Sequence, residues 1–334
     1  MAAAGSTPVW ESSVLKSVIP VVENATLVHV NEQKIEEVAQ WMAYEEFHKP
    51  DGSSLFDYGN DPDFIMDVTL VMNVLNFAFT NFESGVKFET EYMGKVYSDS
   101  EAMMANFHRI IHEGIPFFDG HYLAEITREQ LAYIFAGNIE IPMIDERVAL
   151  LRQVGATLVA DYGGKFHTFV RDCSPRLYDG GNGLLERLTS EFPRFEDVSQ
   201  YNGENVQIYK LAQLGIWGMH LALSPRGAWR LEDAQMLTAF ADYIVPVGLR
   251  VMGIFEYAPE LESQINSLVE VKRDSTAEIE LRASSIYSIA KLTDAINARR
   301  PNFEPLLQPQ VDFRFWKVYH ATHWPHHLTK TIMY

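Results

Sequence analysis

Start and stop signals of α-helices recur along this 334-residue chain and constrain its fold more than any other feature. Asn31 precedes apolar residues at helical spacing, and this segment stops before Pro50-Asp-Gly52. Ser98 and Thr127 each stand three residues before a Glu or a Gln, which is the pattern of a capping box. Another helix is predicted from Arg147 to Tyr162, closed by two glycines.

Strand signals are few. The alternating residues 87–92, the turn residues Met93-Gly94 and residues 95–97 predict a short hairpin. Residues 205–209 fit either a short strand or the entry to a helix. Strands and helices do not alternate as in doubly wound folds. We therefore expect a mostly α fold with a small β element, with residues 31–334 as one domain and residues 1–30 packed on it or flanking it.

Composition excludes several classes of protein. A hydrophobic content of 47% describes a globular chain, and a formal net charge of −18 argues against binding a nucleic-acid polymer. A single small phosphorylated ligand needs only a few local cations and stays possible. Cys173 is the only cysteine, which excludes disulfide scaffolds and multi-cysteine zinc sites. Without a signal peptide or an apolar stretch of about 20 residues, a soluble cytoplasmic protein is expected.

Asp242 is the only formal charge in the apolar run from Met236 to Pro246. A carboxylate there risks losing its hydration, which costs several kcal/mol unless a partner or a function compensates. On an amphipathic helix, however, Asp242 would point to solvent and have no special role. Both interpretations remain open from the residues alone.

The C-terminal region holds a second candidate site. Asp312, Trp316 and Tyr319 share one face if this segment is a helix, where a carboxylate and an indole suit a flat heterocycle. An ordinary helix with a solvated Asp is the alternative. The histidines that follow are candidates for metal binding, anion binding or surface exposure, at positions His320, His323, His326 and His327.

Three other motifs allow a functional and a structural interpretation. Phe77 and Phe79 are either core residues or a stacking platform, and Lys210 is either a surface lysine or a buried phosphate ligand. The glycine-rich residues 180–183 lack the Lys-Ser/Thr of a phosphate loop and are predicted to form a plain loop.

Taken in order, these blocks resemble the queuosine salvage protein family, the queuosine 5′-phosphate N-glycosylase/hydrolases. The resemblance covers nearly the whole chain from about residue 30 and rests on the following segments: Asn76-Phe-Ala-Phe79, Tyr92-x-Gly-Lys-x-Tyr-Ser98, His112-Glu-Gly-Ile-Pro116, Met143-x-x-Glu-Arg147, Tyr162-Gly-Gly-x-Phe166, Phe192-Pro193 with Asp197, Tyr209-Lys-x-Ala-Gln213, Phe240-Ala-Asp-Tyr243, Glu278-x-Glu-x-Arg282, Asp312 with Trp316, and Pro-x-His-x-x-x-x-Ile-x-Tyr334.

The resemblance implies a helical fold similar to DNA glycosylases and a monomer that acts on a free nucleotide without a metal or organic cofactor. It implies hydrolysis of queuosine 5′-phosphate to queuine and ribose 5-phosphate, with Asp242 as the catalytic carboxylate. The implied contacts to base and ribose are His48, Asn76, Phe77, Phe240, Asp312 and Trp316. Those implied for the phosphate end are Lys210, His327, Lys330 and Tyr334.

Two positions depart from the family pattern. Family members carry an acidic residue where this chain has Lys317, and a second acidic residue near the position of Ala321. We expect partly rearranged contacts to the amine and diol of queuine. The alternative functions are a nucleotide N-glycosidase for another base, a non-catalytic protein that binds modified nucleotides, and a metal hydrolase built on the histidines.

Overall fold

The protein folds mainly into α-helices and divides into two compact units. The structure, a computed structural model, describes residues 9–49, 51, 54–320 and 322–334. Unit 1 comprises Met1–Lys49, Asp197–Gln213 and Asp233–Lys330; unit 2 comprises Pro50–Glu196, Leu214–Glu232 and Thr331–Tyr334. The helix α10 (Lys210–Leu223) contributes its first turn to unit 1 and the rest to unit 2. A single domain over residues 31–334 stays a prediction.

The elements of each unit follow one another along the chain. Unit 1 contains η1 (Val9–Glu11), α1 (Ser13–Glu23), β1 (Val28–Val30), α2 (Glu32–Met42), β4 (Val198–Tyr201), β5 (Glu204–Gln207), η4 (Ala234–Met236), α11 (Val245–Val251), β6 (Phe255–Tyr257), α12 (Pro259–Asn266), α13 (Thr276–Ala298) and α14 (Gln308–Tyr319). Unit 2 contains α3 (Pro62–Leu75), β2 (Glu89–Tyr92), β3 (Lys95–Ser98), α4 (Asp99–His112), α5 (Gly120–Glu125), α6 (Arg128–Ile134), α7 (Ile144–Asp161), α8 (Phe166–Asp172), α9 (Leu184–Glu191), η2 (Pro193–Phe195) and η3 (Ser224–Arg226).

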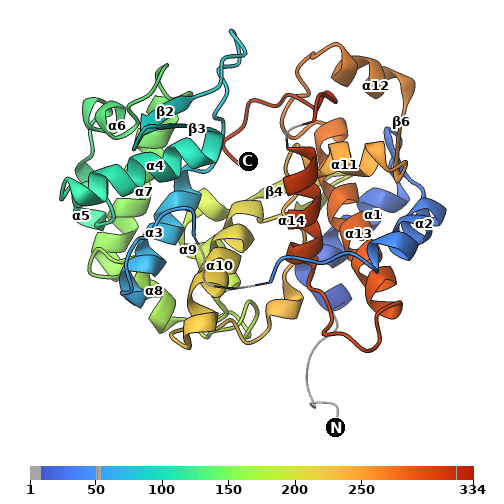
Figure 1. Cartoon of the computed structure of the whole chain (residues 1–334), viewed down its shortest axis with the longest axis horizontal. Helices are drawn as coiled ribbons and strands as arrows, with labels where there is room; N and C mark the ends of the chain where they lie inside the picture. Colours follow the sequence, from blue (N-terminus) through green and yellow to red (C-terminus); the bar gives the residue numbers. More distant parts are fainter. Residues whose placement is uncertain (1–8, 50, 52–53, 321) are drawn as a thin grey trace. The chain divides into compact units, whose positions relative to one another are not determined.

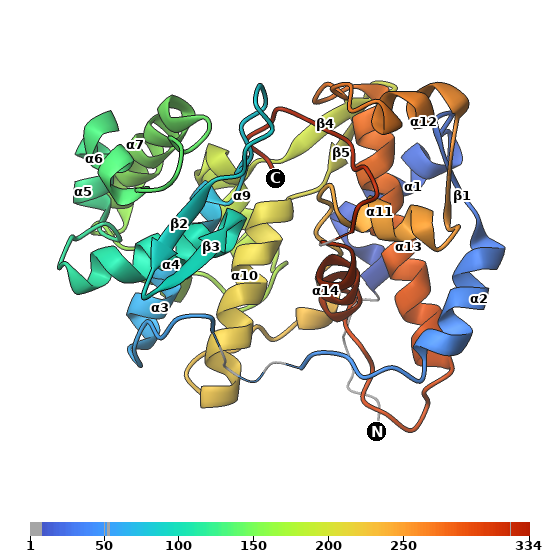
Figure 2. The ribbon, with the colours of Figure 1, turned by 45° about the horizontal axis from the view of Figure 1, so that its top comes forward.

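The named strands pair only as two-stranded antiparallel ribbons, which are β1 with β6, β2 with β3 and β4 with β5. The expectation of a mostly α fold with a small β element is therefore confirmed. The predicted hairpin is the β2–β3 ribbon, which packs on α4 in Figure 2. Its turn is made by Met93 and Gly94, both with positive φ. Likeness to DNA glycosylases stays a prediction.

Most of the helix starts predicted from capping residues are confirmed. Asn31 caps α2 through its side chain, and Thr127 with Gln130 forms the predicted capping box of α6. Ser98 does precede α4, but it makes no side-chain cap hydrogen bond, so the capping box predicted there is wrong. Asp99, the next residue, has a φ of 54°, which departs from the geometry that a capping box needs.

The helix predicted over residues 147–162 begins earlier than expected, at Ile144. The ambiguous residues 205–209 split between the end of β5 and the approach to α10. No helix in the part of the chain that the structure describes is long and apolar enough to cross a membrane.

The core of unit 1 is built around α13, against which α1, α2, α11 and α14 pack (Figure 1). The carboxylate of Glu280, although fully buried on α13, accepts hydrogen bonds from the backbone N–H groups of Thr26, Leu27 and Val28 at 3.0, 2.7 and 3.0 Å. The hydroxyl of Tyr201 donates a further one at 2.9 Å. These bonds stabilise the buried charge and fix the start of β1 on the long helix.

Candidate functional site

Asp242 lies in an irregular segment just before α11, and only 8% of the residue is exposed. A solvent-facing Asp242 on an amphipathic helix is therefore excluded. Its Oδ1 accepts the backbone N–H groups of Ile244 at 2.8 Å and Val245 at 3.0 Å, which lie at the N-terminus of α11. Within the described residues Oδ2 accepts no hydrogen bond, and it is not among the fully buried unpaired atoms. One oxygen is thus anchored, while the other remains available.

A buried arginine holds the chain beside Asp242. Arg282 on α13 pairs with both oxygens of Asp197 at 2.9 and 2.7 Å, and its Nε donates to the carbonyl of Ala241 at 3.1 Å. Asp197 also accepts the backbone N–H of Lys210 at 3.2 Å. The bidentate pair therefore ties α13, the start of α10 and the residue preceding Asp242 together.

Two further side chains fix the same irregular segment. Gln213 on α10 accepts the backbone N–H of Thr238 at 2.9 Å, and Asp312 on α14 accepts that of Phe240 through Oδ2 at 2.9 Å. Long-range side chains thus replace the backbone hydrogen bonds that a helix or sheet would provide. Phe240 itself is 5% exposed.

Lys210 is buried at the first position of α10. Burial lowers the pKa of its ammonium, and Asp242 opposes that shift, as do Asp312 and Asp197, whereas Arg282 adds to it. Across the described part of the chain, Lys210 forms no direct ion pair. Its charge therefore lies near three carboxyl groups, those of Asp242, Asp312 and Asp197, and stays available to an anionic ligand.

The carboxyl of Asp312 on α14 lies close to Asp242 and has a strongly shifted pKa. Burial holds the pKa of its carboxyl well above the usual range, and the nearby Asp242 raises it further. The hydrogen bond from Phe240 and the charge of Lys210 act in the opposite direction. Burial and the neighbouring Asp242 therefore favour a proton on Asp312.

The predicted shared face of Asp312, Trp316 and Tyr319 exists, since all three lie on α14. Trp316 is half-buried, and its ring lies 6.0 Å from that of Phe313 and 4.7 Å from that of His320. His48 is exposed, with its ring centroid 5.3 Å from that of Phe313. Lys317 is exposed, and Ala321 lies outside the described residues.

The C-terminal histidines do not form a metal site in the described ranges, where no group of three or more metal-ligating side chains gathers. His327 is buried, and burial lowers its pKa to about 3, with His326 and Arg282 contributing. Its imidazole is therefore neutral at pH 7 and can act only through hydrogen bonds. Lys330 is exposed, whereas Tyr334 is buried in unit 2.

Asn76 and Phe77 belong to unit 2, at the C-terminal end of α3. Phe77 is buried between two guanidinium groups, with Arg147 at 4.1 Å and Arg194 at 5.1 Å from its ring centroid. Arg147 also donates to the carbonyls of Leu75 at 2.5 Å, of Phe77, and of Ala78 at 2.9 Å. This arginine thus fixes the turn that presents the half-buried Asn76.

Two weaker motifs have structural explanations. The glycine-rich residues 180–183 form a plain loop, as predicted, whose N–H groups at Gly181 and Gly183 are already bonded to the carboxylate of Glu186. Cys173 is buried, and burial raises the pKa of its thiol to about 12, so it is a poor nucleophile.

Arg282, Asp197 and Arg147 received no role from the sequence, although each lies in a motif of the resemblance. A sequence signal existed for Arg282, because charges at residues 278, 280 and 282 interrupt a helix that is otherwise apolar or small in this region. Its partner Asp197 is distant in sequence and gives no such signal.

Comparison with known proteins identifies the family of this chain. A family model described as queuosine salvage protein matches residues 56–334. A Sphaerobacter thermophilus protein named queuosine 5′-phosphate N-glycosylase/hydrolase is 32% identical over 324 residues, 96% of this chain and 97% of that protein. Proteins of the same name from Dictyostelium discoideum and Bos taurus are 30% identical over 268 residues (79% of this chain and 77% of that protein) and 28% identical over 228 (68% and 66%). The chain belongs to the queuosine salvage protein family.

Proposed function

We propose that this protein hydrolyses the N-glycosidic bond of queuosine 5′-phosphate and releases queuine and ribose 5-phosphate. The observation that carries the proposal is the placement of Asp242, with one oxygen anchored at the start of α11 and the other available. The names of the relatives supply the substrate. Water adds a hydroxyl group to C1′ and a proton to the departing base as the bond breaks.

The chemistry requires a fixed negative charge. Breaking the bond builds positive charge on C1′ and O4′ of the ribose, so a carboxylate beside them stabilises the transition state more than the neutral ground state. At ~4 Å and an effective dielectric constant near 20, the attraction is roughly 4 kcal/mol, or about a thousandfold in rate. The backbone N–H groups of Ile244 and Val245 hold the Asp242 carboxylate in place, and the ammonium of Lys210 lies near it.

Asp312 is proposed to assist the leaving base. Queuine is a 7-deazaguanine and offers no N7 for protonation, so its departure depends on hydrogen bonds at the base edge. A carboxyl with a raised pKa can donate such a bond at neutral pH, whereas an ionised one cannot. Phe240 and Trp316 would pack on the base, with His48, Asn76 and Phe77 as further contacts to base and ribose.

For the phosphate end we propose Lys210, His327, Lys330 and Tyr334. Lys210 is supported by its lack of a direct ion pair in the described residues, and His327 by a neutral imidazole that can donate a hydrogen bond. The substrate would be a free nucleotide, since the net charge of −18 disfavours a polymer. With a single cysteine, a monomer in the reducing cytoplasm is the proposed setting.

The test is incubation with queuosine 5′-phosphate and detection of queuine by mass, beside a panel of ordinary nucleoside monophosphates. Release of queuine alone supports the proposal. Release of another base instead identifies an N-glycosidase of different specificity. Tight binding of the nucleotide without base release at high enzyme concentration would contradict catalysis and indicate a sequestering protein. Loss of activity with a chelator would point to a metal hydrolase.

A further inference from the structure

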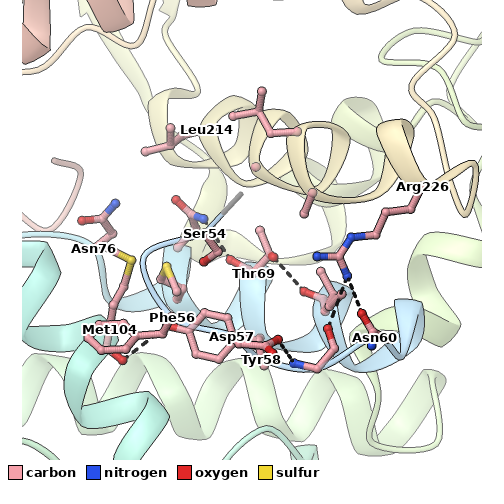
Figure 3. A pocket seen from close by; sticks show the side chains of 18 residues that line it. Ser54, Phe56, Asp57, Tyr58, Asn60, Thr69, Asn76, Met104, Leu214 and Arg226 are labelled. Carbon is pink, nitrogen blue, oxygen red and sulfur yellow. Dashed lines mark hydrogen bonds between the residues drawn. The ribbon is translucent and has the colours of Figure 1, made fainter. Parts of the chain in front are cut away.

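Asp242 lies in an irregular segment of unit 1, where no regular helix or strand fixes the direction of its side chain. Of the residues predicted for the site, only Asn76 lines the cavity of about 470 Å³ in unit 2 (Figure 3). That cavity therefore does not account for the orientation of Asp242. The hydrogen bonds of the irregular segment do, and one of them comes from Arg282, which the proposed steps of the hydrolysis do not use.

The carbonyl oxygen of Ala241 accepts a hydrogen bond from Nε of Arg282 at 3.1 Å. Because a peptide group is planar, this oxygen lies in one plane with the backbone nitrogen and Cα of Asp242. A donor held against the oxygen therefore fixes the plane from which the Asp242 side chain projects. On the C-terminal side, the N–H groups of Ile244 and Val245 hold Oδ1. The direction of the available oxygen follows from both constraints.

Arg282 is itself held rigidly. Its side chain is 1% exposed, and its two terminal nitrogens donate to the two oxygens of Asp197 at 2.9 and 2.7 Å. Asp197 is buried as well, and its backbone carbonyl accepts the N–H groups of Ile208 at 3.0 Å and Tyr209 at 3.3 Å. A guanidinium fixed by a bidentate pair keeps its Nε–H in one direction. The donor to the Ala241 carbonyl is therefore preorganised.

We infer that Arg282 is a positioning residue for the proposed hydrolysis, which aims the available oxygen of Asp242 at C1′ through the Ala241 carbonyl. The inference rests on the proposed function, because it assigns a role within that reaction. The attraction between the carboxylate and the developing positive charge acts only in the transition state, so a displaced carboxylate lowers kcat and leaves KM nearly unchanged. A displacement of about 1 Å can cost up to about a hundredfold in rate.

The charge of Arg282 also reaches the proposed phosphate end. It adds to the lowering of the pKa of Lys210 and of His327, so its removal changes those groups too. Removal of this charge alone would leave the buried Asp197 without its cation, which is strongly destabilising, whereas exchange of both charged partners for neutral groups costs much less. Asp197→Asn keeps an oxygen that accepts the N–H of Lys210.

The test compares two double variants, Asp197→Asn/Arg282→Gln and Asp197→Asn/Arg282→Met, in turnover of queuosine 5′-phosphate. Glutamine places an N–H donor where arginine has Nε, methionine places a methyl group there, and neither carries a charge. Since the charges are the same, the difference between the variants reports the hydrogen bond to Ala241. The methionine variant should have a kcat about tenfold or more below that of the glutamine variant, with KM values within about twofold of each other.

Glu280→Gln is the matched control for damage to α13. Glu280 is fully buried, two residues from Arg282 in the chain, and bonds the backbone N–H groups of Thr26, Leu27 and Val28. Its variant should have a lower melting temperature and an unchanged kcat when turnover is measured well below that temperature. Asp197→Asn/Arg282→Leu is a second donor-free variant for the case in which the methionine protein does not fold.

Three outcomes would overturn this inference alone. They are equal kcat values in the glutamine variant and the donor-free variants, a difference between them that appears only in KM, and a loss of kcat in Glu280→Gln as large as that in the methionine variant. A wild-type protein that releases no queuine would contradict the proposed reaction, and this inference with it.

Discussion

The backbone N–H of Phe240 donates a 2.9 Å hydrogen bond to Oδ2 of Asp312, which joins α14 to the irregular segment two residues before Asp242. Through this contact, one carboxyl of the cluster helps to position the other. The same contact opposes the rise in the pKa of Asp312 without cancelling it. Asp312 is therefore both a structural tie and the proposed hydrogen-bond donor to the leaving base.

Asp312 predicts a pH dependence. Because its folded-state pKa is raised, its contribution to folding stability is present below the ordinary carboxyl pKa of about 3.9 and is lost as pH rises through the raised value. Turnover should decline over the same rise, since only the protonated carboxyl donates to the base. Asp312→Asn donates without titrating and should remove this alkaline decline from the pH profile of kcat. An unchanged profile in that variant would assign the decline to another group.

We expect that substitution of the buried Arg282 strongly lowers the stability of the protein. Arg282→Met would leave the buried carboxylates of Asp197 and Glu278 without their cation, which should lower the free energy of unfolding by roughly 3–5 kcal/mol in urea titrations. The matched control is Arg171→Met, which breaks an ion pair to Asp63 with both side chains exposed and should cost less than about 1 kcal/mol. Similar losses of unfolding free energy in the two variants would show that the buried ion pair contributes no more to stability than the exposed one.

Lys210 predicts a difference between substrates. If its ammonium binds the phosphate, Lys210→Ala should raise the KM for queuosine 5′-phosphate by about tenfold or more. The KM for the unphosphorylated nucleoside should rise far less. Equal losses for nucleotide and nucleoside would remove Lys210 from the phosphate site. Lys330→Ala, at an exposed lysine also proposed for the phosphate end, provides the comparison.

The sequence predicted those features that depend on neighbouring residues. Asn31 and Thr127 mark helix starts because an N-cap needs only its own next turn, and the β2–β3 hairpin follows from two turn residues. Asp312 and Trp316 share a face because α14 is a regular helix.

Features that depend on distant partners could not be predicted in this way. The segment around Asp242 is irregular because Gln213, Arg282 and Asp312 supply its hydrogen bonds from three other helices. No local pattern shows that Arg282 pairs with Asp197, 85 residues away. The anchoring of Asp242 Oδ1 was likewise missed, although the Pro246 that follows is typical of a helix start.

Asp242→Asn tests the central claim most directly. Asparagine keeps the oxygen that accepts the N–H groups of Ile244 and Val245, so the fold and the melting temperature should be retained. The charge facing the ribose is lost, and turnover of queuosine 5′-phosphate should fall by about a hundredfold or more, whereas the exposed control Asp145→Asn should leave it unchanged. Near wild-type release of queuine by a folded Asp242→Asn protein would contradict the assignment of Asp242 as the catalytic carboxylate.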